Sequence, residues 1–223
     1  MRYVQKGPAP ETITQACRDK PELDTTEKAR AAFNSLDKDE VRLSLAKEQG
    51  YLCAFCERRI QTGKPGRTFG EGATQTTTHN MRIAHRTPLD EAPGSALTWE
   101  NLLGSCNDSR TCDSAQHQTV ITVDPTSRVS VNRVRYERRD TAPGVSEIYI
   151  TSDDAAVRRD VEETLGLNGA ELPRMRKVAL ETAKENAHRQ GYGHGKPALR
   201  KYLAAQSSSK HLPHLGFLEA MSR

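Results

Sequence analysis

The chain has 223 residues, a formal net charge of +4 and a pI near 8.8, a mild excess that permits nucleic-acid binding but does not require it. Apolar residues make up 35% of it and aromatic residues 5%, with a mean hydropathy of −0.74, which argues against one large apolar core and favours a fold that a metal ion helps to stabilise. No apolar run could span a bilayer and no signal-peptide segment opens the chain, so we expect a cytoplasmic protein with no membrane partner.

The first region, residues 1–50, is predicted to form an N-terminal arm and helices. Residues 1–25 are polar and interrupted by proline, which favours an extended arm with at most one short helix. Apolar residues at helical spacing predict a helix over 27–36 and another over 38–49, and Asp37 can cap the second one. The second helix would deliver the chain to the central region.

The central region, residues 51–125, contains short predicted elements. They are a strand over 83–87, a short helix or turn over 97–103, a helix over 112–118 and a strand over 120–123. A Gly- and Thr-rich loop over 61–79 precedes them, and its Lys64 and Arg67 could touch phosphate. A solvated insertion is an equally good interpretation of this loop.

The last region, residues 126–223, is predicted to be a hairpin followed by helices that elaborate a single domain. The hairpin pairs 128–136 with 147–151, and Ser152 can cap the helix that follows. Helices are predicted over 153–165, 172–190 and 197–205. In the longest helix, the residues predicted to face inward are Met175, Val178, Ala179 and Ala183.

Four of the five cysteines form two pairs, Cys53 with Cys56 and Cys106 with Cys112. Cysteines of a cytoplasmic protein stay reduced, so paired cysteines indicate a metal site more than disulfides. Four thiolates satisfy the tetrahedral preference of Zn²⁺ and leave no position for water, which predicts a structural zinc ion. Coincidence and a redox dithiol are the alternatives, and Cys17 is interpreted as an ordinary cysteine outside the site.

Between the cysteine pairs lie His85 and Asn101, and after them Asp113 and His117. A neutral imidazole can take a proton from water near neutral pH, so His85 is the candidate general base for phosphodiester hydrolysis. The amide of Asn101 can hold the loop or His85 itself in place. Asp113 and His117 share one face of a helix, and together they could bind a catalytic Mg²⁺ or Mn²⁺. A lone histidine is more often structural, so the surrounding cysteines carry this interpretation.

These residues predict an α+β protein with a zinc-stapled ββα-metal core, the HNH or His-Me nuclease core, embedded in a mainly helical single domain. The chain also carries longer segments typical of one family, namely Met1-Arg-Tyr-Val-Gln-Lys-Gly-Pro8, Glu48-Gln-Gly-Tyr-Leu-Cys-Ala-Phe-Cys-Glu-Arg-Arg-Ile60, Ile83-Ala-His-Arg-Thr-Pro88, Leu97-Thr-Trp-Glu-Asn-Leu-Leu-Gly-Ser-Cys106, Thr111-Cys-Asp113 and Leu165-Gly-Leu-Asn168 followed by Leu172-Pro-Arg-Met-Arg176. Through them it resembles HNH endonucleases of the PtuB type, the nuclease partners of the PtuA ATPase in Septu and related retron anti-phage systems.

The resemblance implies cleavage of DNA, from phage or plasmid, at a ββα-metal site with a structural zinc ion, under control of a PtuA-like ATPase. It implies partner docking on the C-terminal helical region. The chain departs from the family in two places: Ala84 stands where an acidic residue often precedes the base histidine, and Gln116-His117 stands where a basic residue is common. The cation would then be bound by Asp113 with waters, with or without His117, or another acidic residue such as Asp90 or Glu91 would substitute.

Basic residues occur in several clusters, and those nearest the core are the candidate nucleic-acid contacts, Arg58, Arg59 and Arg86. For any one cluster a solvated face is the commoner explanation. Two other functions stay open. One is a stand-alone nuclease of the restriction type, and the other is a zinc-stabilised adaptor that binds DNA or a partner and has lost catalysis, which Ala84 would explain.

Overall fold

The computed structural model describes residues 1–19, 22–62, 64–66, 76–78, 80–169, 171–206 and 210–223, with the backbone alone described for 64–66 and 76–78. Of the two loop residues proposed to touch phosphate, Arg67 lies outside the described residues and Lys64 is described by its backbone only. Within these ranges, no helix combines the length and the apolar character needed to cross a membrane.

The N-terminal helices form where their capping residues predict them. They are α1 (Glu11–Arg18), α2 (Thr26–Asn34) and α3 (Lys38–Glu48). The Asp37 carboxylate caps α3 by accepting from the Asp39 backbone N–H at 3.0 Å, as expected. The arm before α1 is extended but not loose, because Met1 and Val4 are buried and the Val4 N–H donates to the Pro125 carbonyl at 2.8 Å.

The centre of the fold is an antiparallel pair of short strands, β3 (Met81–His85) and β4 (Leu102–Cys106), in which His85 lies opposite Leu102. A 3₁₀ turn, η2 (Trp99–Asn101), leads into β4, and the short helix α4 (Asp113–Gln116) follows it. The predicted helix or turn over 97–103 is therefore correct only for its middle, since its last residues open a strand. The strands β1 (Lys64–Gly66) and β2 (Thr76–Thr78) pair antiparallel within the preceding loop.

The strand predicted over 120–123 does not form. The Thr122 and Val123 N–H groups donate instead to the buried carboxylate of Asp160, with Val123 at 2.9 Å. A side chain distant in sequence thus replaces the strand partner that the backbone would need. No local pattern could have indicated this partner.

The predicted hairpin exists as β5 (Val134–Ala142) and β6 (Val145–Ser152), which pair antiparallel. Its first strand was predicted to begin too early, because residues 128–131 form the short helix α5 (Arg128–Val131). The hydroxyl of Ser127 caps that helix by accepting from the Ser130 N–H at 3.3 Å. β-Branched residues in this segment therefore do not decide its conformation.

After the hairpin the chain forms α6 (Ala155–Arg159), which continues as a π-helical turn, η3 (Asp160–Thr164). The cap is Asp154, whose carboxylate accepts from the Ala156 N–H at 3.0 Å, and not Ser152 as predicted. The Ser152 hydroxyl donates to the Arg133 carbonyl at 2.8 Å and joins the hairpin instead.

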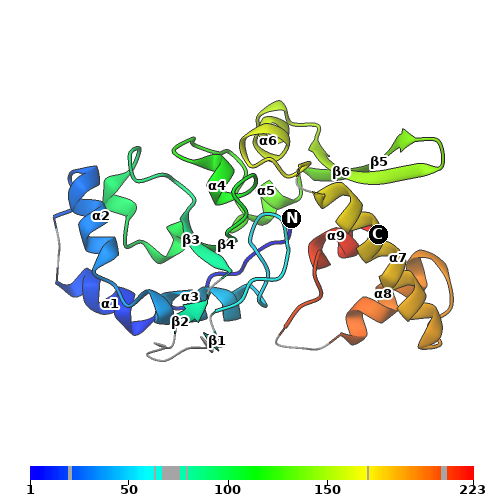
Figure 1. The fold of residues 1–223 in the computed structure, drawn as a ribbon, viewed down its shortest axis with the longest axis horizontal. Helices are drawn as coiled ribbons and strands as arrows, with labels where there is room; N and C mark the ends of the chain where they lie inside the picture. Colours follow the sequence, from blue (N-terminus) through cyan, green and yellow to red (C-terminus); the bar gives the residue numbers. More distant parts are fainter. Residues whose placement is uncertain (20–21, 63, 67–75, 79, 170, 207–209) are drawn as a thin grey trace, which may run out of the picture.

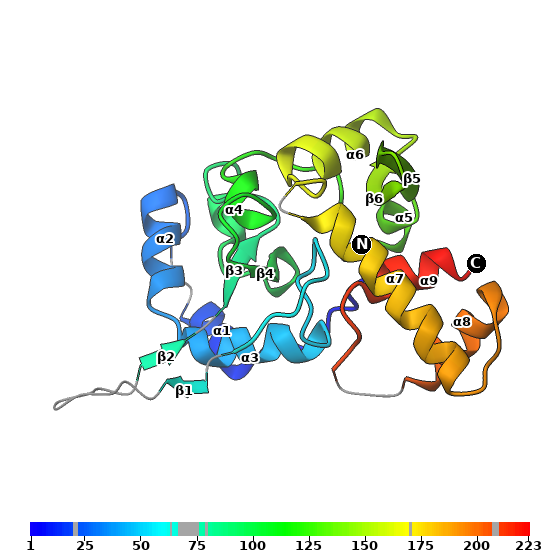
Figure 2. The same ribbon diagram turned by 45° about the vertical axis from the view of Figure 1, so that its right-hand side comes forward.

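Three helices complete the chain, α7 (Leu172–Arg189), α8 (Gly195–Ala205) and α9 (Leu215–Met221), and α7 packs on β6 and on both other helices (Figures 1 and 2). The inward face predicted for α7 is wrong for two residues, because Met175 is 38% exposed and Val178 is 52% exposed. The residues of α7 that are buried are Leu172, Pro173, Arg176, Leu180, Ala183 and Ala187.

Besides a minor apolar cluster of Ala29, Leu89 and Ala96, two large clusters hold the described residues together. The larger joins the N-terminal arm, α3, the paired strands β3 and β4 and the α6–η3 segment, and includes the four cysteine side chains that were expected to bind metal. The smaller joins β6 with α7, α8 and α9 around Phe217. Between them, the buried Met1 ammonium group lies 2.6 Å from a carboxylate oxygen of Glu57, which links the arm to the first cysteine pair.

Candidate functional site

Four buried cysteine side chains converge on one point and can hold a metal ion such as zinc. The sulfur atoms of Cys53, Cys56, Cys106 and Cys112 all lie within 4.8 Å of one another. Cys53 and Cys112 are 3.7 Å apart, and so are Cys56 and Cys106. Tetrahedral zinc with Zn–S bonds of about 2.3 Å places its sulfurs about 3.8 Å apart, so the donor set fits this ion in chemistry and spacing.

Two turns and one strand present the four thiols. Cys53 and Cys56 belong to a tight turn after α3, closed by the Cys53 N–H donating to the Arg58 carbonyl at 2.9 Å. Cys106 ends β4. Cys112 has a positive φ of 60°, and its N–H donates to the Leu165 carbonyl at 2.8 Å. Because η3 lies directly before Leu165, the second cysteine pair is fixed partly by the C-terminal region.

Proton sharing dominates the electrostatics of this cluster. Hydrogen bonds from the neighbouring thiols lower the pKa of Cys106, whereas burial raises the pKa of Cys53 and of Cys112. The pKa of Cys56 is also lowered, so thiolates are favoured at Cys56 and Cys106, while Cys53 and Cys112 keep their protons. A metal ion would displace those protons and convert all the thiols into ligands.

The side chain of Arg58 packs against this cluster. Its guanidinium donates to the sulfurs of Cys56 at 3.4 Å and Cys106 at 3.3 Å, and to Asp108 at 3.0 Å. Burial would lower the pKa of Arg58, but the sulfur atoms and Asp108 raise it overall, so the guanidinium stays charged. Arg58 was proposed as a nucleic-acid contact, and these bonds give it instead a role in holding thiolates.

The other two arginines proposed as nucleic-acid contacts are also engaged within the protein. Arg59 donates to the Gly50 carbonyl at 3.3 Å and to the His211 carbonyl. Arg86 forms an ion pair with Asp124 at 3.6 Å. Arg82 lies exposed on β3, and it is the better candidate for a phosphate contact beside the strand pair.

His85 ends β3 and is half-buried. Its Nε2 lies 3.1 Å from the Ala96 carbonyl oxygen, and its ring contacts the edge of Phe33 at a centroid distance of 4.6 Å. A carbonyl only accepts, so Nε2 carries the proton and Nδ1 keeps the lone pair. Burial lowers the pKa of His85 against the opposing effect of the carbonyl, so the imidazole is neutral at pH 7. A general base requires this state.

Asn101 holds the loop that follows His85. Its side-chain oxygen accepts from the Thr87 N–H at 2.8 Å, and its amide nitrogen donates to the Thr87 carbonyl at 3.0 Å and to the Ser95 hydroxyl at 2.9 Å. The side chain is buried. Of the two roles considered for Asn101, the contacts support the one in which it positions the loop.

Asp113 begins α4, but the helix predicted over 112–118 ends at Gln116. His117 follows it with a positive φ of 49°, so the two residues do not share one helical face as predicted. Burial raises the pKa of the Asp113 carboxyl, while the charges of Arg82 and His117 oppose that rise, so these three groups are close enough to interact. Within the described residues, the cysteine cluster is the one group of three or more potential metal-ligating side chains. Asp113 and His117 thus offer at most two protein ligands to a catalytic cation.

The residues around Ala84 do not supply a replacement for the missing acid. Ala84 is fully buried in β3, and strand alternation directs it and His85 to opposite faces. Asp90 pairs with Arg30 at 3.0 Å on the surface, and Glu91 is exposed. Neither acid belongs to a metal-ligating group in the described part of the chain.

Two buried glutamines position the site, although neither was among the site residues predicted from the sequence. Gln49 donates to the Leu52 and Gly104 carbonyls at 2.7 and 2.8 Å, and its oxygen accepts from the Gly104 N–H at 2.7 Å. This ties the end of α3 to the first cysteine pair and to β4. Gln116 donates to the Arg86 carbonyl at 3.0 Å and so links α4 to the end of β3. Each glutamine satisfies backbone groups that no regular element pairs.

Comparison with protein-family models and with curated proteins finds no match to this chain. The assignment of the site therefore depends on its own geometry. It consists of a four-thiol metal site, a neutral histidine at the end of a strand and an acidic residue at the start of the helix that follows the strand pair.

Proposed function

We propose that the chain is a metal-dependent HNH endonuclease that hydrolyses DNA phosphodiester bonds. The observation that carries this proposal is the state of His85, whose Nε2 is occupied by the Ala96 carbonyl while Nδ1 keeps its lone pair. The order of elements supports it, since β3 and β4 form an antiparallel pair and α4 follows with Asp113 at its start. The resemblance of the quoted segments to PtuB-type nucleases agrees with this reading.

In this proposal the four cysteines hold a structural zinc ion. Every thiol is then a ligand, so the ion offers no position to water and stabilises the loops around the strand pair. Its contribution to folding is on the order of 10 kcal/mol. Arg58 lowers the charge of the thiolate cluster from the side of Cys56 and Cys106.

His85 would remove a proton from the attacking water through Nδ1, and the Asn101 amide would keep the loop after His85 in place during that step. Asp113 and His117 would bind Mg²⁺ or Mn²⁺ together with waters and the phosphate itself, which is how Mg²⁺ commonly binds when protein carboxylates are few. Such an ion offsets the charge of the phosphate. Arg82, the exposed residue of β3, would contact the DNA backbone.

The test is nicking of supercoiled plasmid by the zinc-loaded protein while Mg²⁺ or Mn²⁺ is titrated. We expect His85→Ala to lower the rate by about 100-fold or more, the range of general-base contributions. The matched control is His188→Ala, which removes an exposed imidazole at the end of α7. Equal rates for wild type and His85→Ala, with both proteins folded, would remove His85 from the reaction.

One observation favours the alternative that the chain is a zinc-stabilised adaptor without catalytic activity, namely the buried alanine at position 84. This alternative predicts DNA binding without nicking under any metal. Ala84→Glu separates the two cases, but a carboxylate there enters the interior and lowers stability unless a cation neutralises it. A variant whose melting temperature rises with Mn²⁺, and which nicks where wild type does not, would show an incomplete metal site on a nuclease fold.

We also propose, from the resemblance, that a PtuA-like ATPase docks on the C-terminal helices. An apolar groove of about 480 Å³ lies there between α7 and the segment before α9, lined by Met175, Val178, Leu212 and Leu218 among others. Met175→Glu with Val178→Glu should abolish co-purification with such an ATPase. Leu43→Glu, at an equally exposed apolar residue of α3, is the control that should not. Robust cleavage by the single chain with no ATPase complex would favour the stand-alone nuclease.

A further inference from the structure

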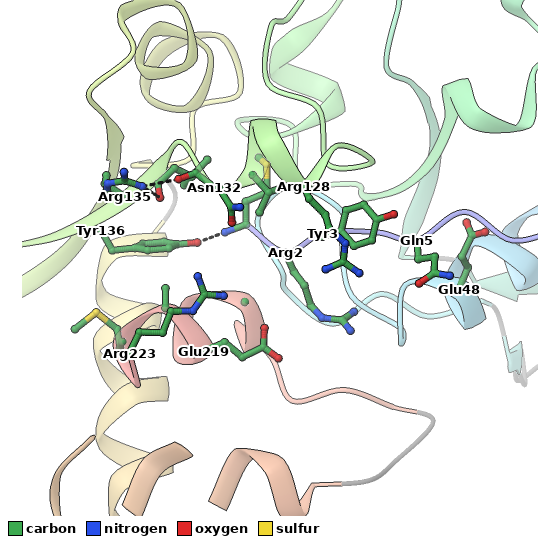
Figure 3. Close-up of a pocket in the computed structure, with 16 residues that line it drawn as sticks. Arg2, Tyr3, Gln5, Glu48, Arg128, Asn132, Arg135, Tyr136, Glu219 and Arg223 are labelled. Atoms are coloured by element: carbon green, nitrogen blue, oxygen red, sulfur yellow. Dashed lines mark hydrogen bonds between the residues drawn. The ribbon is translucent and has the colours of Figure 1, made fainter. Parts of the chain in front are cut away.

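A second concave site lies on the other side of the N-terminal arm from the strand pair, and it shares no residue with the cysteine cluster or with His85, Asn101 and Asp113. Its walls are the start of the arm, the segment from α5 into β5, and α9 (Figure 3). Its volume is about 580 Å³, within the range of pockets that hold small molecules.

The lining of this pocket is strongly basic. It includes four arginines, Arg2, Arg128, Arg135 and Arg223, against two carboxylates, Glu48 and Glu219. Glu48 is neutralised from outside the pocket by Lys6, whose Nζ lies 2.7 Å from it. Arg135 is likewise paired from outside the pocket, with Asp153 at 3.7 Å, so one carboxylate, Glu219, faces the positive charge of three other guanidinium groups.

The four arginines differ in the contacts that they make with the described residues. Arg135 donates to the Asn132 carbonyl at 2.5 Å, and Arg128 stacks on the Tyr3 ring at 4.1 Å. By contrast, the side chains of Arg2 and Arg223 form no hydrogen bond or ion pair with any described residue. Figure 3 shows both side chains projecting into the same space as Glu219.

The backbone holds Arg2 in its place. A Cβ atom on Gly216 would lie 2.6 Å from the Cβ of Arg2 and 2.8 Å from its Cα, so the first turn of α9 packs directly on the arm because position 216 is glycine. The Gly216 N–H donates at 2.5 Å to Glu57, which also pairs with the Met1 ammonium group. Arg2 is thus presented from a rigid support, which reduces the entropy lost when a ligand binds.

Glu219 acts as a weak internal substitute for an anion. Burial raises the pKa of its carboxyl, and the charges of Arg2 and Arg223 only partly oppose that rise. It comes within ion-pair distance of neither arginine in the described structure. A ligand that carried more negative charge and could reach both guanidinium groups would replace this contact with stronger ones.

We propose that this pocket binds a phosphate chain, either as a free polyphosphate or as part of a nucleotide. Guanidinium groups match phosphate oxygens through paired N–H donors, and several arginines around one cavity suit a ligand with adjacent phosphates. A concave pocket of this volume, bounded on three sides, favours a small ligand over a stretch of duplex DNA. The site is independent of the proposed nuclease reaction.

The experiment is isothermal titration of the full chain with sodium triphosphate, with ATP and with inorganic phosphate, at low ionic strength and again at 0.15 M salt. We expect one saturable site for triphosphate and for ATP, weaker binding of phosphate, and weakening by salt because exposed charges are screened within about 8 Å. Equal affinities for triphosphate and ATP would show that the phosphate chain alone is recognised, whereas tighter binding of ATP would show that the nucleoside also contributes.

Variants decide whether the pocket is responsible. Arg2→Gln and Arg223→Gln should each weaken binding by about tenfold, since each removes a charge-assisted donor. Arg18→Gln removes an exposed arginine of α1 and should change nothing. Glu219→Gln should tighten binding by about threefold or more, while Glu11→Gln, which removes the same charge on α1, should not.

The proposal is overturned if triphosphate and ATP show no saturable binding at low salt, or if Arg2→Gln and Arg223→Gln bind as wild type does. It is also overturned if duplex DNA binds in a manner sensitive to these two variants and triphosphate neither binds nor competes. Nicking activity would not change in any of these variants, so failure here leaves the proposed nuclease function untouched.

Discussion

The two halves of the molecule hold their shape by different means. In the half around β3 and β4, the 11-residue helix α3 packs on two five-residue strands, and the rest is short turns and a four-residue helix, with four cysteine side chains in its interior. The other half has a hairpin with strands of nine and eight residues and an 18-residue helix, which close over aliphatic and aromatic side chains around Phe217. The regular elements of the second half pack by themselves, whereas in the first half a metal ion would hold the turns that carry the cysteines.

Loss of the metal ion should have the largest effect on stability, and it should affect the half around β3 and β4 first. Cys112→Ser removes one of four ligands, so we expect loss of zinc and of folding free energy on the order of 10 kcal/mol around the strand pair. Hydrogen exchange should rise first over 51–62 and 102–113 and later in α7. Cys17→Ser, outside the cluster and exposed, is the control. If amide hydrogen exchange rose in both halves at the same time, the two halves would not be stabilised separately.

A substitution in the second half should lower stability without affecting the metal site. Phe217 is fully buried and meets the Tyr136 ring at a centroid distance of 4.9 Å. Phe217→Ala should lower the free energy of unfolding by about 3–5 kcal/mol, because it opens a cavity among the helices. The zinc content should stay at the wild-type value, as measured by atomic emission. Val129→Ala, at an exposed apolar residue, should change stability by less than about 0.5 kcal/mol.

A smaller effect is expected where Arg58 supports the thiolates. Arg58→Gln removes the donors to Cys56 and Cys106 and leaves all four ligands in place. Zinc affinity, measured by competition with a chelator, should fall by about 10- to 100-fold, as is common for groups that contact metal ligands. The control is Arg110→Gln, since Arg110 also contacts Asp108, at 3.5 Å, but no sulfur. An unchanged affinity in Arg58→Gln would mean that its role is only packing.

The pH dependence of stability tests the contact between the two halves at His214. His214 is 2% exposed at the start of α9, and burial lowers its pKa to about 4. The charged groups that face it are Glu57, which raises this pKa, and Arg176, Arg58 and the Met1 ammonium group, which lower it. The native state therefore carries a neutral imidazole over the whole neutral range.

The unfolded chain takes up a proton at His214 as pH falls through about 6.5, while the native state does so only near pH 4. Stability is thus fully present above 6.5 and decreases as pH falls toward 4, by up to about 2 kcal/mol at pH 5. His214→Gln should flatten the dependence of unfolding free energy on pH between 7 and 5. His188→Gln, at an exposed histidine, should keep the wild-type slope. The same slope in both variants would refute the assignment.

Local chemistry predicts much of the fold, and tertiary contacts decide the rest. The cap of α3 and the convergence of the cysteine pairs follow from neighbouring residues and spacing. The buried face of α7 does not, because Met175 and Val178 are as apolar as Leu180 and the helices that cover one side come later in the chain. Arg176 is buried although arginine is usually exposed. Its burial is possible because its guanidinium donates to the Leu167 and Ile148 carbonyls at 2.6 and 3.2 Å.

In the candidate site too, some features could be predicted from the sequence and others depend on tertiary contacts. The residue types and spacing pointed to His85, Asn101 and the cysteines, and the structure adds which nitrogen of His85 is free. The contacts of Arg58 could not be predicted, because an arginine after a cysteine pair is equally suited to phosphate or to thiolate until Asp108 and the sulfurs are placed around it. The roles of Gln49 and Gln116 could not be predicted either, because nothing in the neighbouring sequence shows which backbone groups a glutamine side chain will meet.

The most direct test of the account is the pH dependence of plasmid nicking by the zinc-loaded chain at saturating Mn²⁺. Burial lowers the pKa of His85, so the rate should be constant through neutral pH and fall on acidification with a midpoint below 6.5, the usual value for histidine. That limb, and the activity, should be lost in His85→Ala. A limb of the same midpoint and a rate of the same size in His85→Ala would contradict the assignment of His85 as the base.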